Sequence, residues 1–139
     1  MSAEENAALL ERYISEVWEA ANPEAVRRFA AESFRRHRSP LSDPLDREGQ
    51  VALLKGFRDA FPDITIEVED VVATSDRIAF RSTMRGTHGG EFLGIPPTGR
   101  HVTVGLVDIL RIQDGKFVEQ WGGPDLLDLL KQLGASIER

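Results

Sequence analysis

The chain has 139 residues, which is enough for one domain with a hydrophobic core and too few for two. Its 23 acidic and 17 basic side chains give a net charge of -6, so we expect no binding to nucleic acid or to an anionic membrane. The sequence has no cysteine, which excludes disulfides, thiolate catalysis and thiolate metal sites. No apolar run approaches the roughly 20 residues of a membrane span, and the N-terminus lacks a leader-like apolar segment, so we expect a single cytoplasmic domain over residues 1–139.

The N-terminal part of the chain has the periodicity of helices. Ser2 and Glu5 form a capping box, and apolar residues then recur at intervals of three and four. This pattern predicts a long helix that ends near Asn22. Asn22 and Pro23 are typical of a helix start, so we expect a second, short helix after it.

An extended piece and a loop separate these two helices from a third. The extended piece is SFRRHR, and the loop is SPLSDPLD, whose two prolines oppose both helix and strand. Apolar residues at helical spacing then predict a helix over about 46–61, which Pro62 ends.

From residue 64 the apolar period changes from that of a helix to that of a strand with one buried and one wet face. The alternating runs lie at 64–74, 77–88, 101–112 and 116–121, the last two joined by a turn at Asp114 and Gly115. A closing helix is predicted over about 125–133. Helices followed by consecutive strands predict the α+β class, here a curved antiparallel sheet wrapped around N-terminal helices. Such a sheet leaves a pocket between itself and the helices.

Asp108 is the first candidate for chemistry, because it is the one charged residue on the apolar face of its strand run. The other residues of that face are aliphatic: Val102, Val104, Leu106, Leu110 and Ile112. Burial would favour the neutral carboxyl, so Asp108 is a candidate hydrogen-bond donor or general acid. The alternatives are that Asp108 pairs with Arg81 or Arg85, or that this face is not the buried one.

Two aromatic residues of the first helix face the predicted pocket. Tyr13 is the only tyrosine and lies on the inward stripe, where its hydroxyl needs a partner such as the carboxyl of Asp108. Its alternative role is that of a core aromatic whose hydroxyl reaches the rim. Trp18, on the same stripe, is expected in the core or in the pocket wall.

His37 is the natural base for a pocket that holds an acid, because its imidazole titrates near neutrality. Alternation in the extended piece places His37 with Arg35 on one side and Phe34 with Arg36 on the other. A solvated residue at the edge of the sheet is the alternative for His37.

The segment GEFLGIPPTGR, at 90–100, is longer than a hairpin needs. Its prolines stiffen the turn, and Phe92, Leu93 and Ile95 would be costly to leave in water. We expect these apolar residues to cover the mouth of the cavity or a neighbouring subunit.

Other polar residues are weaker candidates. His88 and His101 flank this loop, but a metal site would need a third ligand at suitable spacing, so no metal is expected. Asp125 lies in the first turn of the last helix, where the helix dipole alone favours a carboxylate. The chain has no P-loop, dinucleotide fingerprint or nucleophile elbow, so we expect no cofactor.

The segments GEFLGIPPTGR and DILRIQDGKFVEQWGGPDLLDLLKQLGA, in this order, resemble the SnoaL-like polyketide cyclase (ester cyclase) family of the nuclear transport factor 2-like fold. The resemblance covers nearly the whole chain. It implies a cone-shaped domain with a deep apolar cavity, often a homodimer through the outer face of the sheet, and a polyketide-like small-molecule substrate. The best-known members close a ring by aldol condensation without a cofactor, using an Asp base just after the last strand, helped by a Gln and a His on the preceding strand.

Carried over residue by residue, the resemblance places the catalytic Asp at Gly122 and the Gln and His at Leu106 and Asp108, while Asp125 matches a second acid of the family. The familiar aldol residues are therefore absent. The segments ERYISEV and LVDILRI are also similar to ketosteroid isomerases, which implies Tyr13 and Asp108 as an oxyanion hole, with His37 near the position of the base.

These observations favour an enzyme that transfers a proton next to a carbonyl of an apolar, oxygenated substrate, with Asp108, His37 and Tyr13 as catalytic residues. The residues expected to contact substrate are Trp18, Trp121, Leu106, Phe92, Arg85, His88 and Asp125. One alternative is a non-catalytic ligand-binding protein that keeps the cavity and has lost the base. Another is a relative of epoxide hydrolases or cofactor-free oxygenases, for which Asp108 and Arg85 are the candidates.

Overall fold

The structure, a computed structural model, describes residues 2–37 and 44–136. Its elements, in chain order, are α1 (Ala3–Tyr13), the π-helical segment η1 (Ile14–Glu19), the 3₁₀ turn η2 (Pro23–Ala25), α2 (Val26–Phe29), β1 (Ala30–His37), α3 (Arg47–Ala60), β2 (Thr65–Ala73), β3 (Arg77–Thr87), β4 (His101–Gln113), β5 (Lys116–Pro124) and α4 (Leu126–Gln132). The loop predicted at 39–46 falls mostly on residues 38–43, which lie outside the described ranges. No helix of the described residues is both long and apolar enough to cross a membrane.

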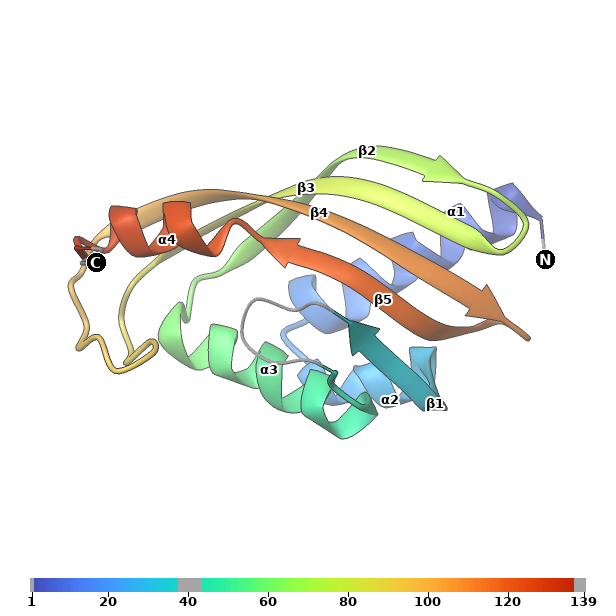
Figure 1. Ribbon diagram of the computed structural model, residues 1–139, viewed down its shortest axis with the longest axis horizontal. Coiled ribbons are helices and arrows are strands. Elements are labelled where there is room, and N and C mark those ends of the chain that lie inside the picture. Colours follow the sequence, from blue (N-terminus) through green and yellow to red (C-terminus); the bar gives the residue numbers. More distant parts are fainter. Residues whose placement is uncertain (1, 38–43, 137–139) are drawn as a thin grey trace.

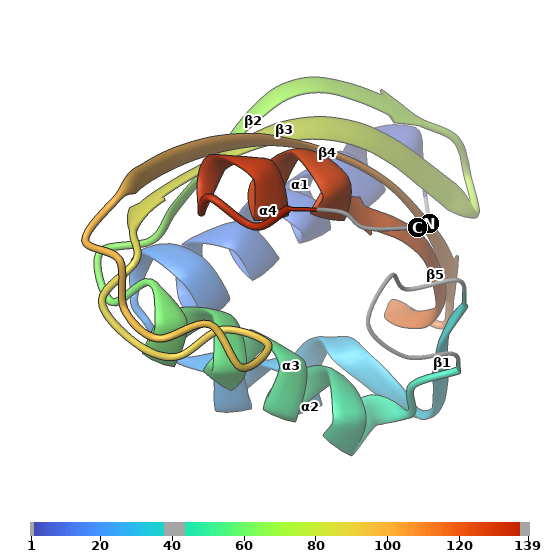
Figure 2. The ribbon, with the colours of Figure 1, turned by 60° about the vertical axis from the view of Figure 1, so that its left-hand side comes forward.

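The five strands form one curved sheet in the order β1-β5-β4-β3-β2. The sheet arches over α1, and α2 and α3 lie across the open side of the arch (Figures 1 and 2). The predicted α+β cone is confirmed, with one difference: β1 runs parallel to β5, so the sheet is mixed. Strand alternation predicts which side chains face inward, but it carries no information about the direction of the neighbouring strand.

Side-chain caps start the three longer helices where the sequence predicts them. Ser2 and Glu5 close the predicted capping box at the start of α1. Asp46 accepts a hydrogen bond from the backbone N–H of Gly49 at 2.7 Å and starts α3. Asp125 caps α4 in the same way, because its side chain accepts a hydrogen bond from the backbone N–H of Asp128 at 3.1 Å. These caps satisfy N–H groups that would otherwise lack a partner at the helix ends.

The helix predicted to reach Asn22 is α-helical only as far as Tyr13 and then widens into η1. The backbone N–H of Ala20 donates to Ser15 at 2.9 Å, and that of Asn22 to Val17 at 3.1 Å, which is the spacing of a π-helix. Apolar residues at intervals of three and four fit both forms of helix, so the sequence pattern does not reveal the wider turn.

The apolar side chains form two clusters under the sheet. The first joins α1, α2 and α3 to the strands and contains Tyr13, whose ring meets those of Phe29 and Phe117 edge-on at 5.5 and 5.3 Å. The second lies at the other end, between α3, α4 and the β3–β4 loop. Trp18 and Ile66 contact both clusters, so the two are continuous at that point.

Candidate active site

Asp108 lies on the inner face of β4 and is 3 % exposed. Its Oδ1 accepts hydrogen bonds from Arg36 Nη2 at 3.2 Å and from Gln120 Nε2 at 3.0 Å. Among the described residues, no donor reaches its Oδ2. The carboxylate is thus held through one oxygen while the other has no protein partner in the described part of the chain.

Arg36 reaches Asp108 because β1 alternates as the sequence predicts, with Phe34 and Arg36 facing inward. The guanidinium also donates to the carbonyl oxygen of Gly122 at 2.9 Å and to Gln50 Oε1 at 3.2 Å. Parallel pairing places Arg36 opposite Gln120 on β5, beside the acid. The buried positive charge therefore has a charged partner and two neutral acceptors, as a buried ion pair requires.

Gln50 completes the cluster from the opposite side, because it lies on the buried face of α3. Its Nε2 donates to Gln120 Oε1 at 3.5 Å. We call Asp108, Arg36, Gln120 and Gln50 the inner polar cluster. Its members come from β4, β1, β5 and α3, so the site forms only when these elements have packed together.

A cavity of about 40 Å³ lies against this cluster. Its lining consists of Tyr13, Ile14, Trp18, Arg36, Gln50, Leu54, Ile66, Phe80, Ser82, Leu106, Asp108 and Gln120. This volume is enough for water, and far less than the roughly 300 Å³ or more of a small-molecule site. Ser82 Oγ and Arg36 Nε are buried and have no hydrogen-bond partner among the described residues.

The two titratable hydroxyl and carboxyl groups of the cavity are both shifted towards their protonated forms. Burial raises the pKa of Asp108, against the opposing effects of the Arg36 charge and the Gln120 hydrogen bond. Burial likewise raises the pKa of Tyr13 to about 12, although a hydrogen bond with Gln50 acts in the opposite direction. Tyr13 is therefore a hydrogen-bond donor at any physiological pH, and Asp108 is a stronger base than an exposed carboxylate.

The structure brings Tyr13, Trp18, Leu106 and Asp108 together around the cavity, but it places His37 on the other side of the sheet. His37 Nε2 lies 2.8 Å from Glu119 Oε2, and the His37 ring stacks obliquely on Trp121 at 5.5 Å. Since side chains alternate along a strand, the neighbour of an inward Arg36 must point outward. His37 and Trp121 thus do not line the cavity.

The remaining candidates also lie away from the cavity. Arg85 is on the outer face of β3 and pairs with Glu67 at 3.0 Å. Asp125 serves as the cap of α4, the alternative that its place in the helix suggested. Neither of the two arginines considered as partners of Asp108 reaches it, because Arg81 pairs with Asp70 on the same outer face.

His88 and Phe92 stabilise the long β3–β4 loop. The Nδ1 of His88 accepts a hydrogen bond from the backbone N–H of Thr98 at 3.2 Å, and its ring lies 5.5 Å from that of Phe61. Phe92 is 6 % exposed and packs between Phe57 and Phe61. The loop therefore covers the second apolar cluster instead of the mouth of this cavity. In both ribbon views it lies beside the end of α3.

Sequence reasoning missed Arg36, Gln50, Gln120 and Ser82. Each stands at an inward position of a correctly predicted strand or helix, so the signal was a polar residue at a position that the period reserves for apolar ones. Among residues 2–37 and 44–136, no three His, Asp or Glu side chains lie close enough together to hold a metal ion.

Comparison with known proteins matches residues 8–133 to the model of the SnoaL-like polyketide cyclase family. The chain belongs to this family. It is similar to AclR of Streptomyces galilaeus, a proposed hydroxylase, with 34 % identity over 96 % of this chain and 98 % of that chain and a TM-score of 0.82. TsrD of Streptomyces laurentii gives 29 % identity, a TM-score of 0.85 and coverage of 98 % and 99 %.

A curated relative matches over a shorter segment. The nogalonic acid methyl ester cyclase of Streptomyces nogalater is 41 % identical over 49 residues, which is 35 % of this chain and 37 % of that protein. The match thus covers about a third of the relative's length.

In this SnoaL-like chain, an Asp at position 122, where the sequence resemblance implied the catalytic Asp, would require the backbone to move. Its φ is +100°, and a Cβ atom there would lie 2.0 Å from the carbonyl oxygen of Val107. Only glycine adopts this conformation without strain. The position expected to hold the base instead supplies a carbonyl oxygen that accepts from Arg36.

Proposed function

We propose that the protein is a cofactor-independent enzyme that transfers a proton next to a carbonyl group of a polyketide-like substrate. The observation that carries this proposal is the buried carboxylate of Asp108, fixed through Oδ1 and without a described protein partner on Oδ2. Family membership supports the polyketide-like substrate. The homodimer and the cytoplasmic location expected from the sequence remain part of the proposal.

In this proposal Asp108 is the base, because His37 does not line the cavity. Its Oδ2 takes a proton from the carbon next to the carbonyl, while Arg36 and Gln120 keep the carboxyl group in one orientation. The raised pKa brings the basicity of Asp108 closer to that of a neutral-pH catalyst. The proton then returns either to another carbon, which gives an isomer, or to the alkoxide formed when the enolate closes a ring.

Tyr13 and Ser82 stabilise the enolate oxygen. The phenol of Tyr13 remains protonated because its pKa is about 12, and the Ser82 hydroxyl has no partner among the described residues. Hydrogen-bond donors that are already oriented in a dry cavity stabilise a developing negative charge better than water does. The cavity must widen beyond its present 40 Å³ to admit the reacting atoms.

The test uses nogalonic acid methyl ester, named by the curated relative, in heavy water with NMR detection. We expect an isomeric product, enzyme-dependent exchange of deuterium into the position next to the carbonyl of the remaining substrate, and a rate that falls about 100-fold or more in Asp108→Asn. Asp108→Asn combined with Arg36→Gln tests the same role without leaving a buried arginine unpaired. Asp70→Asn, on the outer face, is the matched control and should keep full activity. Equal activity in all variants would rule out Asp108 as the base.

A second candidate is hydrolysis of an epoxide in the substrate: Asp108 takes a proton from water, the water oxygen bonds to a ring carbon, the C–O bond of the epoxide breaks, and the proton passes to the resulting alkoxide. The cavity beside Asp108 is large enough for water. In this case the product would contain oxygen from labelled water, and no deuterium would enter next to the carbonyl. The two isotope labels, measured in one reaction, separate the candidates.

A further inference from the structure

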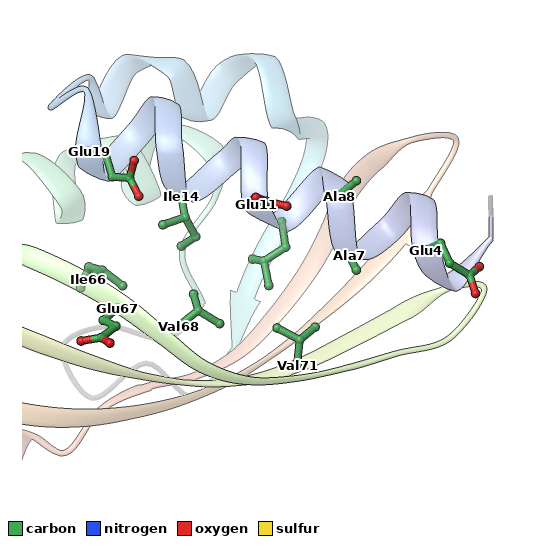
Figure 3. A pocket seen from close by; sticks show the side chains of 11 residues that line it. Glu4, Ala7, Ala8, Glu11, Ile14, Glu19, Ile66, Glu67, Val68 and Val71 are labelled. Carbon is green, nitrogen blue, oxygen red and sulfur yellow. The ribbon is translucent and has the colours of Figure 1, made fainter.

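A groove of about 680 Å³ runs between α1 with η1 on one side and the edge strand β2 on the other (Figure 3). We call it the α1–β2 groove. Its lining consists of Ala7, Ala8, Leu10, Ile14, Ile66, Val68 and Val71, with Glu4, Glu11, Glu19 and Glu67. In Figure 3 the side chains of Ala7 and Ile14 point from the helix towards the strand. Val71 remains 42 % exposed, so its apolar surface is available to a ligand.

Two residues, Ile14 and Ile66, line both this groove and the cavity beside Asp108. They are therefore the wall between the two spaces. Ile14 belongs to η1, and π-helical turns of this kind occur frequently at functional sites. The same segment supplies Trp18 to the cavity and Glu19 to the groove.

The volumes of the two spaces show that a small molecule fits in the groove and not in the cavity, so Ile14 and Ile66 separate such a molecule from Asp108. The cavity has room for water only, whereas the groove lies within the roughly 300–1,000 Å³ range of small-molecule sites. A hollow of about 380 Å³ shares Ser82 and Leu106 with the cavity, but its other strand residues, such as Arg81 and Val107, face outward. The sheet itself separates that hollow from Asp108, because side chains alternate between the two faces.

The charge of the groove selects its occupant. Four of its lining residues are glutamates and none is basic. Glu67 pairs with Arg85, whereas Glu4, Glu11 and Glu19 have no ion-pair partner among the described residues. An apolar molecule with a cationic or neutral polar group is favoured there, and one with a carboxylate is repelled.

We propose that the α1–β2 groove holds the part of the substrate that does not react, that this part is apolar and neutral or cationic, and that displacement of Ile14 and Ile66 admits the reacting carbonyl to Asp108. This inference rests on the proposed function and names the charge class of its substrate.

Two matched probes test the groove directly: naphthylethylammonium and naphthylpropionate, which share an apolar body and differ in charge. We expect amide NMR shifts around Ala7, Ile14 and Val71 on titration with the ammonium probe, and binding of the propionate at least about tenfold weaker. The difference should shrink at high ionic strength, since the glutamates are near solvent. Equal affinity for both probes, or shifts confined to another surface, would overturn the inference.

Two substitutions with matched controls test whether the probes bind in the groove and whether its charge selects between them. Ala7→Trp fills the groove and should weaken binding of the ammonium probe about tenfold. Gly56→Trp, on an open face of α3, should leave that binding unchanged. Glu11→Lys should reverse the preference between the probes, whereas Glu32→Lys, at the opposite edge of the sheet, should leave it unchanged. Circular dichroism confirms that each variant is folded. An unchanged preference in Glu11→Lys would contradict the charge argument.

Turnover separates this inference from the proposed function. If Asp108→Asn abolishes turnover and Ala7→Trp leaves it at the wild-type level, the proposed function stands and the groove is not the substrate site. If both probes behave as expected and Asp108→Asn keeps full turnover, the groove binds ligands and the proposed base is wrong. Loss of turnover in both variants, with full activity in Gly56→Trp, supports the two together.

Discussion

Asp108 combines features that usually exclude each other, since its carboxyl group is buried beside Arg36 and leaves one oxygen without a described partner. Arg36 and Gln120 both bind Oδ1, so the hydrogen bonds that stabilise the charge do not occupy Oδ2. Burial raises the pKa and these two partners lower it. The basicity of the carboxylate therefore depends on each hydrogen bond to Oδ1.

Gln120→Met should raise the pKa of Asp108 further. The substitution introduces an apolar side chain of similar size and removes a hydrogen bond that stabilises the ionised form, so the proton is held more tightly. If ionised Asp108 is the base, activity is lost as the pH falls through this pKa, and the acidic limb of the pH profile moves to higher pH in the variant. Carbon NMR titration of the Asp108 carboxyl measures the shift without a substrate. Gln113→Met, on an exposed position of β4, is the control, and a lower pKa in Gln120→Met would contradict the prediction.

Gly122→Asp should fail to create a cyclase of the familiar family type. A side chain at this position meets the backbone of β4 and requires φ of +100°, so we expect a loss of stability of about 1–3 kcal/mol or more. Urea unfolding measures the loss, and Gly56→Asp, where a Cβ meets nothing within 4 Å, is the control. A stable Gly122→Asp variant with new aldol activity would show that the strand adapts.

Alternation along β1 was sufficient to find Arg36 from the sequence. It correctly separates Phe34 and Arg36 from Arg35 and His37, and Phe34 shows which side is buried. The same alternation places His37, which its residue type had favoured as the base, on the outer face of the sheet. Asp108 and Tyr13 were located correctly because single polar residues in apolar stripes are visible in the sequence. Their roles in catalysis remain predictions.

At the scale of elements, local sequence patterns predict the helices and strands closely, but they do not predict which strands pair with each other. Caps at Ser2 and Asp46 and the turn at Asp114 mark the ends of elements through interactions within a few residues. The parallel pairing of β1 with β5 joins segments about eighty residues apart, for which no local pattern exists. The inner polar cluster depends on this pairing, so the sequence showed its members separately and not as a site.

The β3–β4 loop shows how one element is held by a buried aromatic side chain. Phe92→Ala should destabilise the fold by about 3–5 kcal/mol, because the ring fills space between Phe57 and Phe61. Leu93→Ala should cost less than about 0.5 kcal/mol, since Leu93 is 56 % exposed. Urea unfolding of the two variants makes the comparison. Similar losses in both would mean that the loop does not depend on the packing of Phe92.

At the scale of the whole molecule, the sheet has one covered face and one open face. The helices cover the inner face, while the outer face of the central strand β4 exposes Val107 and Ile109, at 61 % and 40 %. Apolar residues in the middle of an open sheet face are typical of a surface that contacts another protein. The resemblance to the family implied a homodimer through this face, which remains a prediction.

Val107→Lys tests the predicted homodimer. Two copies that meet through β4 would bury both lysines against apolar surface, and the lost complementarity should shift the protein from dimer to monomer at micromolar concentration. Analytical ultracentrifugation of the wild type and the variant measures the change, and Leu93→Lys, on the exposed loop, should leave the oligomeric state as it is. Because Asp108 lies on the inner face of the same strand, the monomeric variant should keep the raised pKa of Asp108. A wild type that sediments as a monomer would show that the open face of the sheet does not pair with a second copy.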